Sequence, residues 1–181
     1  GMLLRRGDRW SEWSPFLEYS DAEAAVWLQA ALETEEPPIL RERVPVNATI
    51  PVVSPRRAAE IVRNSGCRTA KVKVADPNSC LDDDLARLAS VRAALGDDGQ
   101  LRVDANGAWS VEAAQRSLTA MAAYDLQYVE QPCKTVDELA ELRTRLRDAG
   151  LDLWIAADES VRRADDPYRV VEIGAADVVV L

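Results

Sequence analysis

The sequence contains no histidine. Without this residue the chain cannot form a Ser-His-Asp or Cys-His catalytic group. A zinc site is disfavoured as well, because only scattered cysteines and carboxylates could bind the metal. Acid–base chemistry near neutral pH must therefore use lysine, carboxyl, tyrosine or cysteine side chains.

Cysteine and positive charge are also scarce. Cys67, Cys80 and Cys133 are an odd number at irregular spacing, which does not build a disulfide framework and favours reduced thiols in a cytoplasmic protein. The 22 basic residues are outnumbered by 31 acidic ones, and a net charge of −9 argues against a nucleic-acid partner. No apolar run approaches the roughly 18 residues that a transmembrane helix needs, so no membrane partner is expected.

From Val44 onward, short β-branched runs alternate with longer stretches that have helical spacing. The predicted strands cover residues 46–53, 69–75, 100–104, 126–130, 153–157 and 177–181. The helices between them are predicted to begin near Pro55, Leu81, Val111, Val136 and Pro167. Five strand-then-helix units followed by a sixth strand predict an α/β fold with a parallel sheet, as in a (β/α) barrel. A doubly wound open sheet is the competing fold, but no glycine-rich phosphate loop follows the first strand.

The first 43 residues differ from the rest and are rich in tryptophan. Ser20 and Glu23 have the spacing of a capping box that opens a helix through about Leu32. We interpret residues 1–43 as part of a small separate domain and residues 44–181 as part of the barrel domain. A complete barrel would need roughly another one hundred residues. We therefore expect a chain that is shortened at both ends, with an exposed edge at its sixth strand.

Three acidic residues stand at corresponding places in three consecutive units. Asp104, Glu130 and Asp158 each close a predicted strand, at the end where barrel enzymes build their active sites. Any one of them alone could equally be a helix cap or a solvated loop residue. Together they aim three carboxylates at one point, where their mutual repulsion favours a bound cation. Oxygen ligands select a hard ion, with Mg²⁺ expected first and Mn²⁺ second.

Lys71 and Lys73 lie two positions apart on the second predicted strand and so share one face. Val72 and Val74 are expected to face the helices, which turns the two lysines toward the barrel interior. The alternative is a polar strand end whose lysines reach water, and that is the better interpretation of an isolated Lys-x-Lys. Here the two lysines lie one strand before the acidic series. This position favours a lysine that acts as a base, because the second ammonium and a nearby cation lower its pKa.

This pattern resembles the enolase superfamily, with Lys-x-Lys on the second strand and Asp, Glu and Asp closing the next three. Within the superfamily the chain is similar to the muconate-lactonising subgroup, and more narrowly to actinobacterial o-succinylbenzoate synthases. The resemblance covers nearly the whole chain. Its narrower part rests on residues 13–19 (Trp-Ser-Pro-Phe-Leu-Glu-Tyr), 46–51 (Val-Asn-Ala-Thr-Ile-Pro), 104–109 (Asp-Ala-Asn-Gly-Ala-Trp) and 129–132 (Val-Glu-Gln-Pro).

The resemblance implies an enolase-type (β/α) barrel, of which six strands are present, and the remnant of an α+β N-terminal capping domain. It implies that Asp104, Glu130 and Asp158 bind Mg²⁺. Lys73 would be the base, and Lys71 would tune it and help to hold the substrate carboxylate.

The resemblance also implies residues that support the metal ligands, and one further active-site lysine. Asn106 and Glu159 are expected to support the metal ligands by hydrogen bonds. The family has another active-site lysine on the sixth strand, and the sequence through Leu181 does not show it. We therefore expect little activity from these 181 residues alone.

The implied activity is that of a carbon–oxygen lyase acting on a small-molecule carboxylate. The reaction is the Mg²⁺-dependent syn-dehydration of 2-succinyl-6-hydroxy-2,4-cyclohexadiene-1-carboxylate, a step of menaquinone biosynthesis. An N-acylamino acid racemase or a dipeptide epimerase with the same site is the first alternative. A non-catalytic barrel used for binding or oligomerisation is the alternative from another class, and the oligomeric state stays open.

Overall fold

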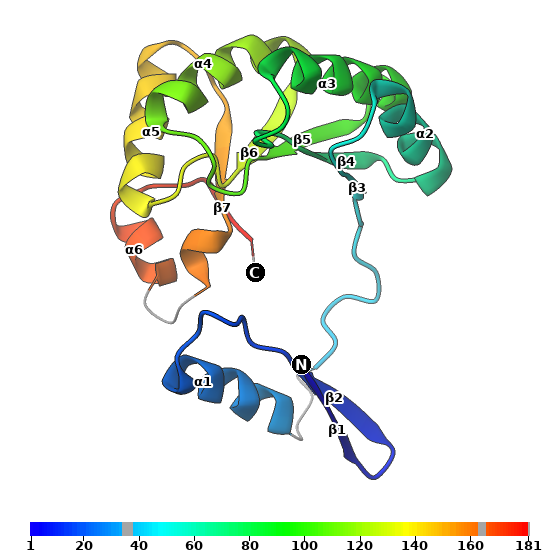
Figure 1. Cartoon of the computed structure of the whole chain (residues 1–181), viewed down its shortest axis with the longest axis vertical. Helices are drawn as coiled ribbons and strands as arrows, with labels where there is room; N and C mark the ends of the chain where they lie inside the picture. Colours follow the sequence, from blue (N-terminus) through cyan, green and yellow to red (C-terminus); the bar gives the residue numbers. More distant parts are fainter. Residues whose placement is uncertain (34–37, 163–165, 181) are drawn as a thin grey trace. The chain divides into compact units, whose positions relative to one another are not determined.

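The computed structural model describes residues 1–33, 38–162 and 166–180. The chain divides into two compact units, Gly1–Val44 and Pro45–Leu181, and the sequence placed this division after residue 43 (Figure 1). Within the part of the chain that the structure describes, no helix is both long and apolar enough to cross a membrane.

The first unit is a β-hairpin followed by one helix. Strands β1 (Met2–Arg6) and β2 (Arg9–Trp13) pair in antiparallel fashion, and α1 (Asp21–Leu32) follows. The helix begins with the predicted capping box, in which the Ser20 hydroxyl and the Glu23 carboxylate exchange hydrogen bonds with each other's backbone N–H groups. The hairpin was not predicted, because its strands carry no regular alternation of apolar and polar residues.

The second unit is built on a six-stranded parallel sheet whose strands lie in sequence order. The strands are β3 (Ala48–Ile50), β4 (Thr69–Lys73), β5 (Gln100–Asp104), β6 (Leu126–Glu130), β7 (Trp154–Ala157) and β8 (Val178–Val179). The connecting elements are α2 (Pro55–Ser65), α3 (Leu81–Leu95), α4 (Val111–Met121), η1 (Ala122–Tyr124), α5 (Val136–Asp148), η2 (Glu159–Val161) and α6 (Asp166–Glu172). Strands in this order, the first five each followed by a helix, are the wall of a (β/α) barrel, which confirms the predicted fold class.

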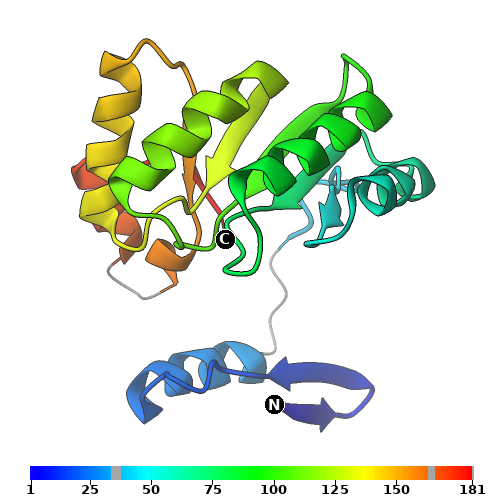
Figure 2. The same ribbon diagram turned by 45° about the horizontal axis from the view of Figure 1, so that its top comes forward.

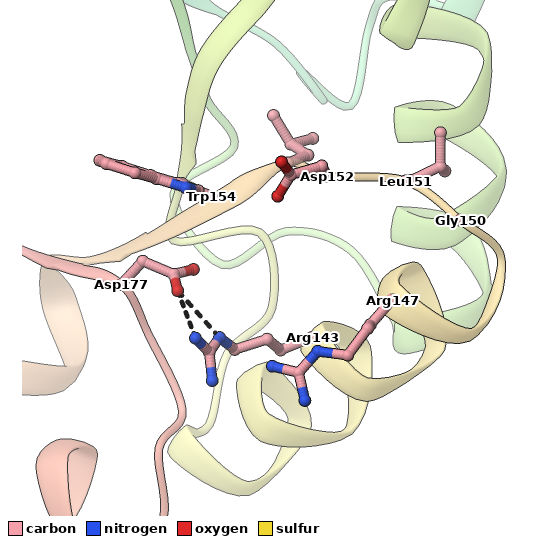
Figure 3. A pocket seen from close by; sticks show the side chains of 8 residues that line it. Arg143, Arg147, Gly150, Leu151, Asp152, Trp154 and Asp177 are labelled. Atoms are coloured by element: carbon pink, nitrogen blue, oxygen red, sulfur yellow. Dashed lines mark hydrogen bonds and ion pairs between the residues drawn. The ribbon is translucent and has the colours of Figure 1, made fainter.

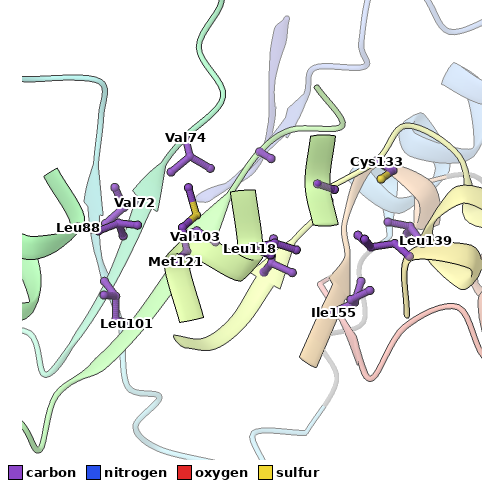
Figure 4. Close-up of a cluster of buried hydrophobic side chains, with 14 of the residues drawn as sticks. Val72, Val74, Leu88, Leu101, Val103, Leu118, Met121, Cys133, Leu139 and Ile155 are labelled. Carbon is purple, nitrogen blue, oxygen red and sulfur yellow. The ribbon is translucent and has the colours of Figure 1, made fainter. Parts of the chain in front are cut away.

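The hydrophobic core lies between one face of the sheet and the helices that cover it (Figures 1, 2 and 4). Val72 of β4 and Val74, which follows the strand, are buried on this side, as predicted, so Lys71 and Lys73 face the inside of the curved sheet. The fully buried side chains on the helices include Leu88, Leu118 and Leu139. Burial of such side chains stabilises each helix against the sheet by roughly 1.5–3 kcal/mol per residue.

Local capping residues determine where most helices begin. The Ser54 side chain accepts a hydrogen bond from the Arg57 backbone, and Pro55 occupies the first helical position. The predicted starts at Pro55, Leu81, Val111 and Val136 are confirmed, and α6 begins one residue before the predicted Pro167.

Four predicted strands are shorter in the structure, among them residues 153–157, of which β7 covers Trp154–Ala157. Residues 46–53 were predicted as a strand, but β3 covers Ala48–Ile50 only, since Pro51 has no N–H to donate to a ladder. Strand β4 ends at Lys73 and not at Ala75, because Ala75 adopts a left-handed backbone with a φ of 63°. Of the predicted last strand, Val178–Val179 pairs with β7, and Leu181 lies outside the described residues.

Candidate active site

The parallel register brings most of the predicted site residues to one edge of the sheet. Lys73 of β4 is in register with Asp104 of β5, and Asp104 is in register with Glu130 of β6. Asp158 directly follows β7, and Lys71 lies two positions before Lys73 on the same face. Because these strands are parallel, their carboxyl ends meet at the same edge, as the spacing of the three acids predicted.

The two lysines contact the carboxylates of Asp104 and Glu130 directly. Lys71 Nζ donates to Glu130 Oε1 at 2.5 Å and lies 3.2 Å from Asp104 Oδ2. Lys73 Nζ donates to the same Asp104 Oδ2 at 2.5 Å and to Asn106 Oδ1 at 2.8 Å. Asp104 and Glu130 are completely buried. The ammonium groups therefore supply the countercharge that buried carboxylates require.

Asn106 extends this cluster toward the loop after β7. Its Nδ2 donates to Glu159 Oε1 at 3.0 Å, and its backbone N–H donates to Asp104 Oδ1 at 3.0 Å. Arg162 pairs with the same Glu159 oxygen at 3.2 Å and approaches Asp158 Oδ2 to 4.0 Å. Sequence reasoning missed Arg162, because a basic residue three or four positions after an acid is typical of an ordinary surface pair.

The carboxyl groups of this cluster have pKa values shifted in opposite directions. Burial disfavours ionisation of Asp104, but the hydrogen bond from Lys73 and the charge of Lys71 outweigh it and lower the pKa of this carboxyl. Burial dominates at Glu130 and, with the charge of Asp104, raises its pKa despite the hydrogen bond from Lys71. At Asp158, burial followed by the charge of Glu159 raises the pKa.

Lys71 is stabilised as an ammonium. Burial alone would lower the pKa of Lys71, yet the hydrogen bond and charge of Glu130, followed by the charge of Asp104, raise it above its ordinary value. The sequence suggested that a second ammonium and a cation would favour a neutral lysine. In the structure the two buried carboxylates outweigh the neighbouring ammonium at Lys71, since both lie within 3.2 Å of its nitrogen.

The donor set has the chemistry of a site for a hard divalent cation. Carboxylates end three adjacent strands, and Glu130 Oε2 is buried with no hydrogen-bond partner among the residues that the structure describes. Lys71 and Lys73, however, occupy the positions beside Asp104 and Glu130. Among the described residues, no group of three His, Cys, Asp or Glu side chains is arranged to hold a metal ion. The residue types fit Mg²⁺, and the assignment of all three acids as its ligands stays a prediction.

The backbone at this edge is strained at three successive strand ends. Ala75, Asn106 and Gln131 follow β4, β5 and β6, and their φ values are 63°, 47° and 37°. Such left-handed conformations cost an L-residue of order 1–2 kcal/mol. They turn the chain sharply after each strand, and strain of this kind concentrates at functional sites.

A buried ion pair supports the strand that carries the two lysines. Asp84 and Arg87, both on α3, pair with each other and are almost completely buried. Asp84 Oδ2 accepts from the backbone N–H of Ala75 at 3.0 Å. Arg87 donates to the carbonyl oxygens of Lys73 and Val53, each at 3.3 Å. This pair was not predicted, because its partners on the strand ends are distant in sequence.

Two cavities lie at opposite ends of the strands. A cavity of about 400 Å³ opens beside Lys73 and Asn106, and apolar residues such as Pro51 and Val52 line part of it. A second cavity of about 340 Å³ lies near the amino ends of β7 and β8 (Figure 3). Its Arg143 and Asp177 bind each other, and none of the predicted site residues lines it. The cavity beside Lys73 is therefore the candidate for a substrate.

Family models match both units of the chain. Residues 54–181 match the family described as enolase C-terminal domain-like, and residues 1–35 match the family described as enolase N-terminal domain-like. The first match covers strands β4 to β8, the helices of the sheet and every predicted site residue, and it begins after β3.

Curated relatives are about half identical to the chain. An o-succinylbenzoate synthase of Thermobifida fusca (strain YX) is 52% identical over an alignment of 184 positions, which covers 100% of this chain and 56% of the relative. An o-succinylbenzoate synthase of Mycolicibacterium smegmatis is 51% identical over 177 residues, 95% of this chain and 53% of the relative. The chain thus spans about half the length of the curated relatives it matches.

Solved structures support the same fold. A mandelate racemase/muconate lactonizing family protein from Azoarcus sp. EbN1 has a TM-score of 0.67 and 33% identity, covering 77% of this chain and 36% of that one. A dipeptide epimerase from Enterococcus faecalis V583, complexed with Mg and a dipeptide, has a TM-score of 0.64 and 32% identity, covering 75% and 38%. Fold and sequence agree, and the chain belongs to the enolase superfamily, in the family of enolase C-terminal domain-like proteins.

Proposed function

We propose that the full-length protein is an o-succinylbenzoate synthase. It would convert 2-succinyl-6-hydroxy-2,4-cyclohexadiene-1-carboxylate to o-succinylbenzoate and water, using Mg²⁺. The observation that carries the proposal is the contact of two lysine ammoniums with buried carboxylates on adjacent strand ends. Relatives of about 50% identity bear this name, which favours the synthase over the more distant epimerases and racemases.

Lys73 is the proposed base. Its side chain is about a third exposed and borders the 400 Å³ cavity, so its nitrogen can reach a bound molecule. In the reaction Lys73 acts as the neutral amine: its Nζ takes the proton from the ring carbon that carries the carboxylate, and the electron pair of that C–H bond enters the ring system. The hydroxyl group on the neighbouring carbon then leaves with its electron pair, and the ring becomes aromatic.

A syn-dehydration removes the proton and the hydroxyl group from the same face of the ring. The ammonium formed on Lys73 is then on the correct face to return its proton to the departing hydroxyl group, which leaves as water. The Asn106 side chain, 2.8 Å from Lys73 Nζ, orients this nitrogen through both events.

Asp104, Glu130 and Asp158 are the proposed ligands of the divalent cation. When bound, the cation would stabilise the negative charge that develops on the substrate carboxylate. Lys71 lies deeper than Lys73 and is held as an ammonium, so we assign it to the substrate carboxylate and not to proton removal. Asn106 and Glu159 connect the two ends of the ligand set by hydrogen bonds.

The test is turnover by the full-length protein and by single lysine variants. The chain has three lysines, and the exposed Lys134 provides a matched control. We expect Lys73→Ala to lower kcat by about 10²–10⁴-fold, the usual contribution of a general base. Lys71→Ala should raise KM and lower kcat, and Lys134→Ala should change neither. Loss of the diene absorbance on aromatisation measures each rate.

Two results would contradict the proposal in different ways. Near-normal kcat in Lys73→Ala would mean that another group removes the proton. A wild-type protein that binds Mg²⁺ but neither converts the cyclohexadiene nor exchanges a substrate proton with solvent would favour a non-catalytic barrel. Racemisation of an N-acylamino acid without dehydration would favour the alternative enzyme.

A further inference from the structure

Gln131 connects the loops that carry the three acidic residues. It follows Glu130 directly, is completely buried and has a left-handed backbone with a φ of 37°. Its backbone N–H donates to the Ala156 carbonyl at 2.8 Å, and its own carbonyl accepts from the Gly107 N–H at 2.7 Å. The main chain of this one residue thus contacts both β7 and the loop after β5.

The side-chain amide of Gln131 uses all of its hydrogen-bonding capacity. Its Nε2 donates to the Cys133 carbonyl at 2.9 Å and to Ser160 Oγ at 2.6 Å. Its Oε1 accepts from the backbone N–H groups of Asp158 at 2.9 Å and of Ser160 at 3.2 Å. A buried amide has two donor hydrogens and two acceptor positions, so none is left for water or another group.

The bonds to Asp158 and Ser160 replace sheet pairing where the sheet ends. The last register pair between β6 and β7 joins Glu130 and Ala156, so Asp158 lies beyond the ladder. Its backbone has a φ of −121° and a ψ of −79°, which continues neither a strand nor a helix. The Gln131 amide supplies the acceptor that the ladder no longer provides, and it fixes this loop against the end of β6.

We propose that Gln131 is a positioning residue that fixes the Asp158 carboxylate relative to that of Glu130. This inference rests on the proposed function only in taking these two acids as cation ligands. Because protein groups use its whole amide, Gln131 would act on the cation through the backbone of the Asp158 loop and not by direct contact. Outer partners that orient metal ligands commonly change metal affinity by about 10–100-fold when they are removed.

The test is the Mg²⁺ affinity of the full-length protein, measured by titration calorimetry without substrate. Gln131→Met keeps the length of the side chain and removes all four amide bonds. We expect it to weaken Mg²⁺ binding by about tenfold or more, with kcat recovering at saturating Mg²⁺. Gln127→Met is the matched control, since Gln127 lies on the same strand and its amide binds Arg102 at 2.7 Å. It should leave Mg²⁺ affinity unchanged.

A milder variant keeps the inference testable if Gln131→Met does not fold. Ser160→Ala removes one of the four bonds and should weaken Mg²⁺ binding by a smaller factor. Unchanged Mg²⁺ affinity in a folded Gln131→Met variant, or in Ser160→Ala where only that protein folds, would overturn the inference. A wild-type protein that binds Mg²⁺ tightly but does not convert the cyclohexadiene would instead refute the proposed function.

Discussion

Replacing Arg87 by methionine should strongly destabilise the barrel unit. Arg87 is 3% exposed and pairs with an Asp84 side chain that is 5% exposed, so the substitution leaves a carboxylate buried without its partner. Breaking a buried pair in this way costs about 3–5 kcal/mol. The carbonyl oxygens of Val53 and Lys73 lose their side-chain donors as well. Urea unfolding of the full-length protein, followed by circular dichroism, measures the loss.

A second variant separates charge burial from packing. Asp84→Asn keeps an oxygen for the Ala75 N–H but leaves the Arg87 charge uncompensated, so it should cost a similar amount. The double variant has no unpaired charge and should cost clearly less than the sum of the two single changes. A strictly additive double variant, or a loss below about 1 kcal/mol for Arg87→Met, would refute this account of the pair.

The pH dependence of the same variant has a defined sign. Burial, followed by the charge of Asp83, raises the pKa of Asp84, against the Ala75 hydrogen bond and the charge of Arg87, which lower it. A carboxyl whose pKa is raised by folding binds its proton more readily in the folded state, so this group adds stability as the pH falls. Without Arg87 the pKa of Asp84 rises further. The destabilisation by Arg87→Met, relative to wild type, should therefore be smaller at pH 5 than at pH 8.

Three further outcomes can be measured on the full-length protein. Leu118→Ala, in the fully buried centre of α4, should lower the free energy of unfolding by about 2–5 kcal/mol in a denaturant titration. Burial raises the pKa of the Cys133 thiol to about 12, whereas Cys80 is exposed. A disulfide reagent at pH 8 should therefore modify Cys80 rapidly and Cys133 only after unfolding, and peptide mass mapping measures both reactions. Glu130→Gln should weaken Mg²⁺ binding in calorimetry, and an unchanged affinity would exclude Glu130 as a ligand.

The sequence predicted those features that neighbouring residues determine. The starts of α3, α4 and α5 at Leu81, Val111 and Val136 were predicted correctly, since local capping residues and turn signals mark them. The edge of the sheet that carries Asp104 and Glu130 was also predicted, because one acid per repeating unit must recur at the same strand end.

Features that depend on distant residues could not be predicted. The hydrogen bond of Lys71 to Glu130 joins residues 59 positions apart, and only the register of three strands brings them together. The same holds for Gln131, whose role depends on the loop after β7 and not on its own neighbours. The gathering of all three carboxylates at one point was expected from strand order alone. In the structure Lys71 contacts both Asp104 and Glu130, because a buried carboxylate needs a countercharge, and the convergence of Asp158 with them stays a prediction.

The left-handed residues after β4, β5 and β6 differ in whether their backbone strain can be relieved without the loss of a side-chain contact. Glycine adopts this conformation without strain, so Ala75→Gly should stabilise the protein by about 0.4–1 kcal/mol or more without removing a polar contact. Glycine at Asn106 or Gln131 would relieve the same backbone strain. It would also remove the side chains that contact Lys73 and the Asp158 loop. Under the roles proposed for Asn106 and Gln131, selection for thermal tolerance is free to act at Ala75 and is opposed by function at the other two positions.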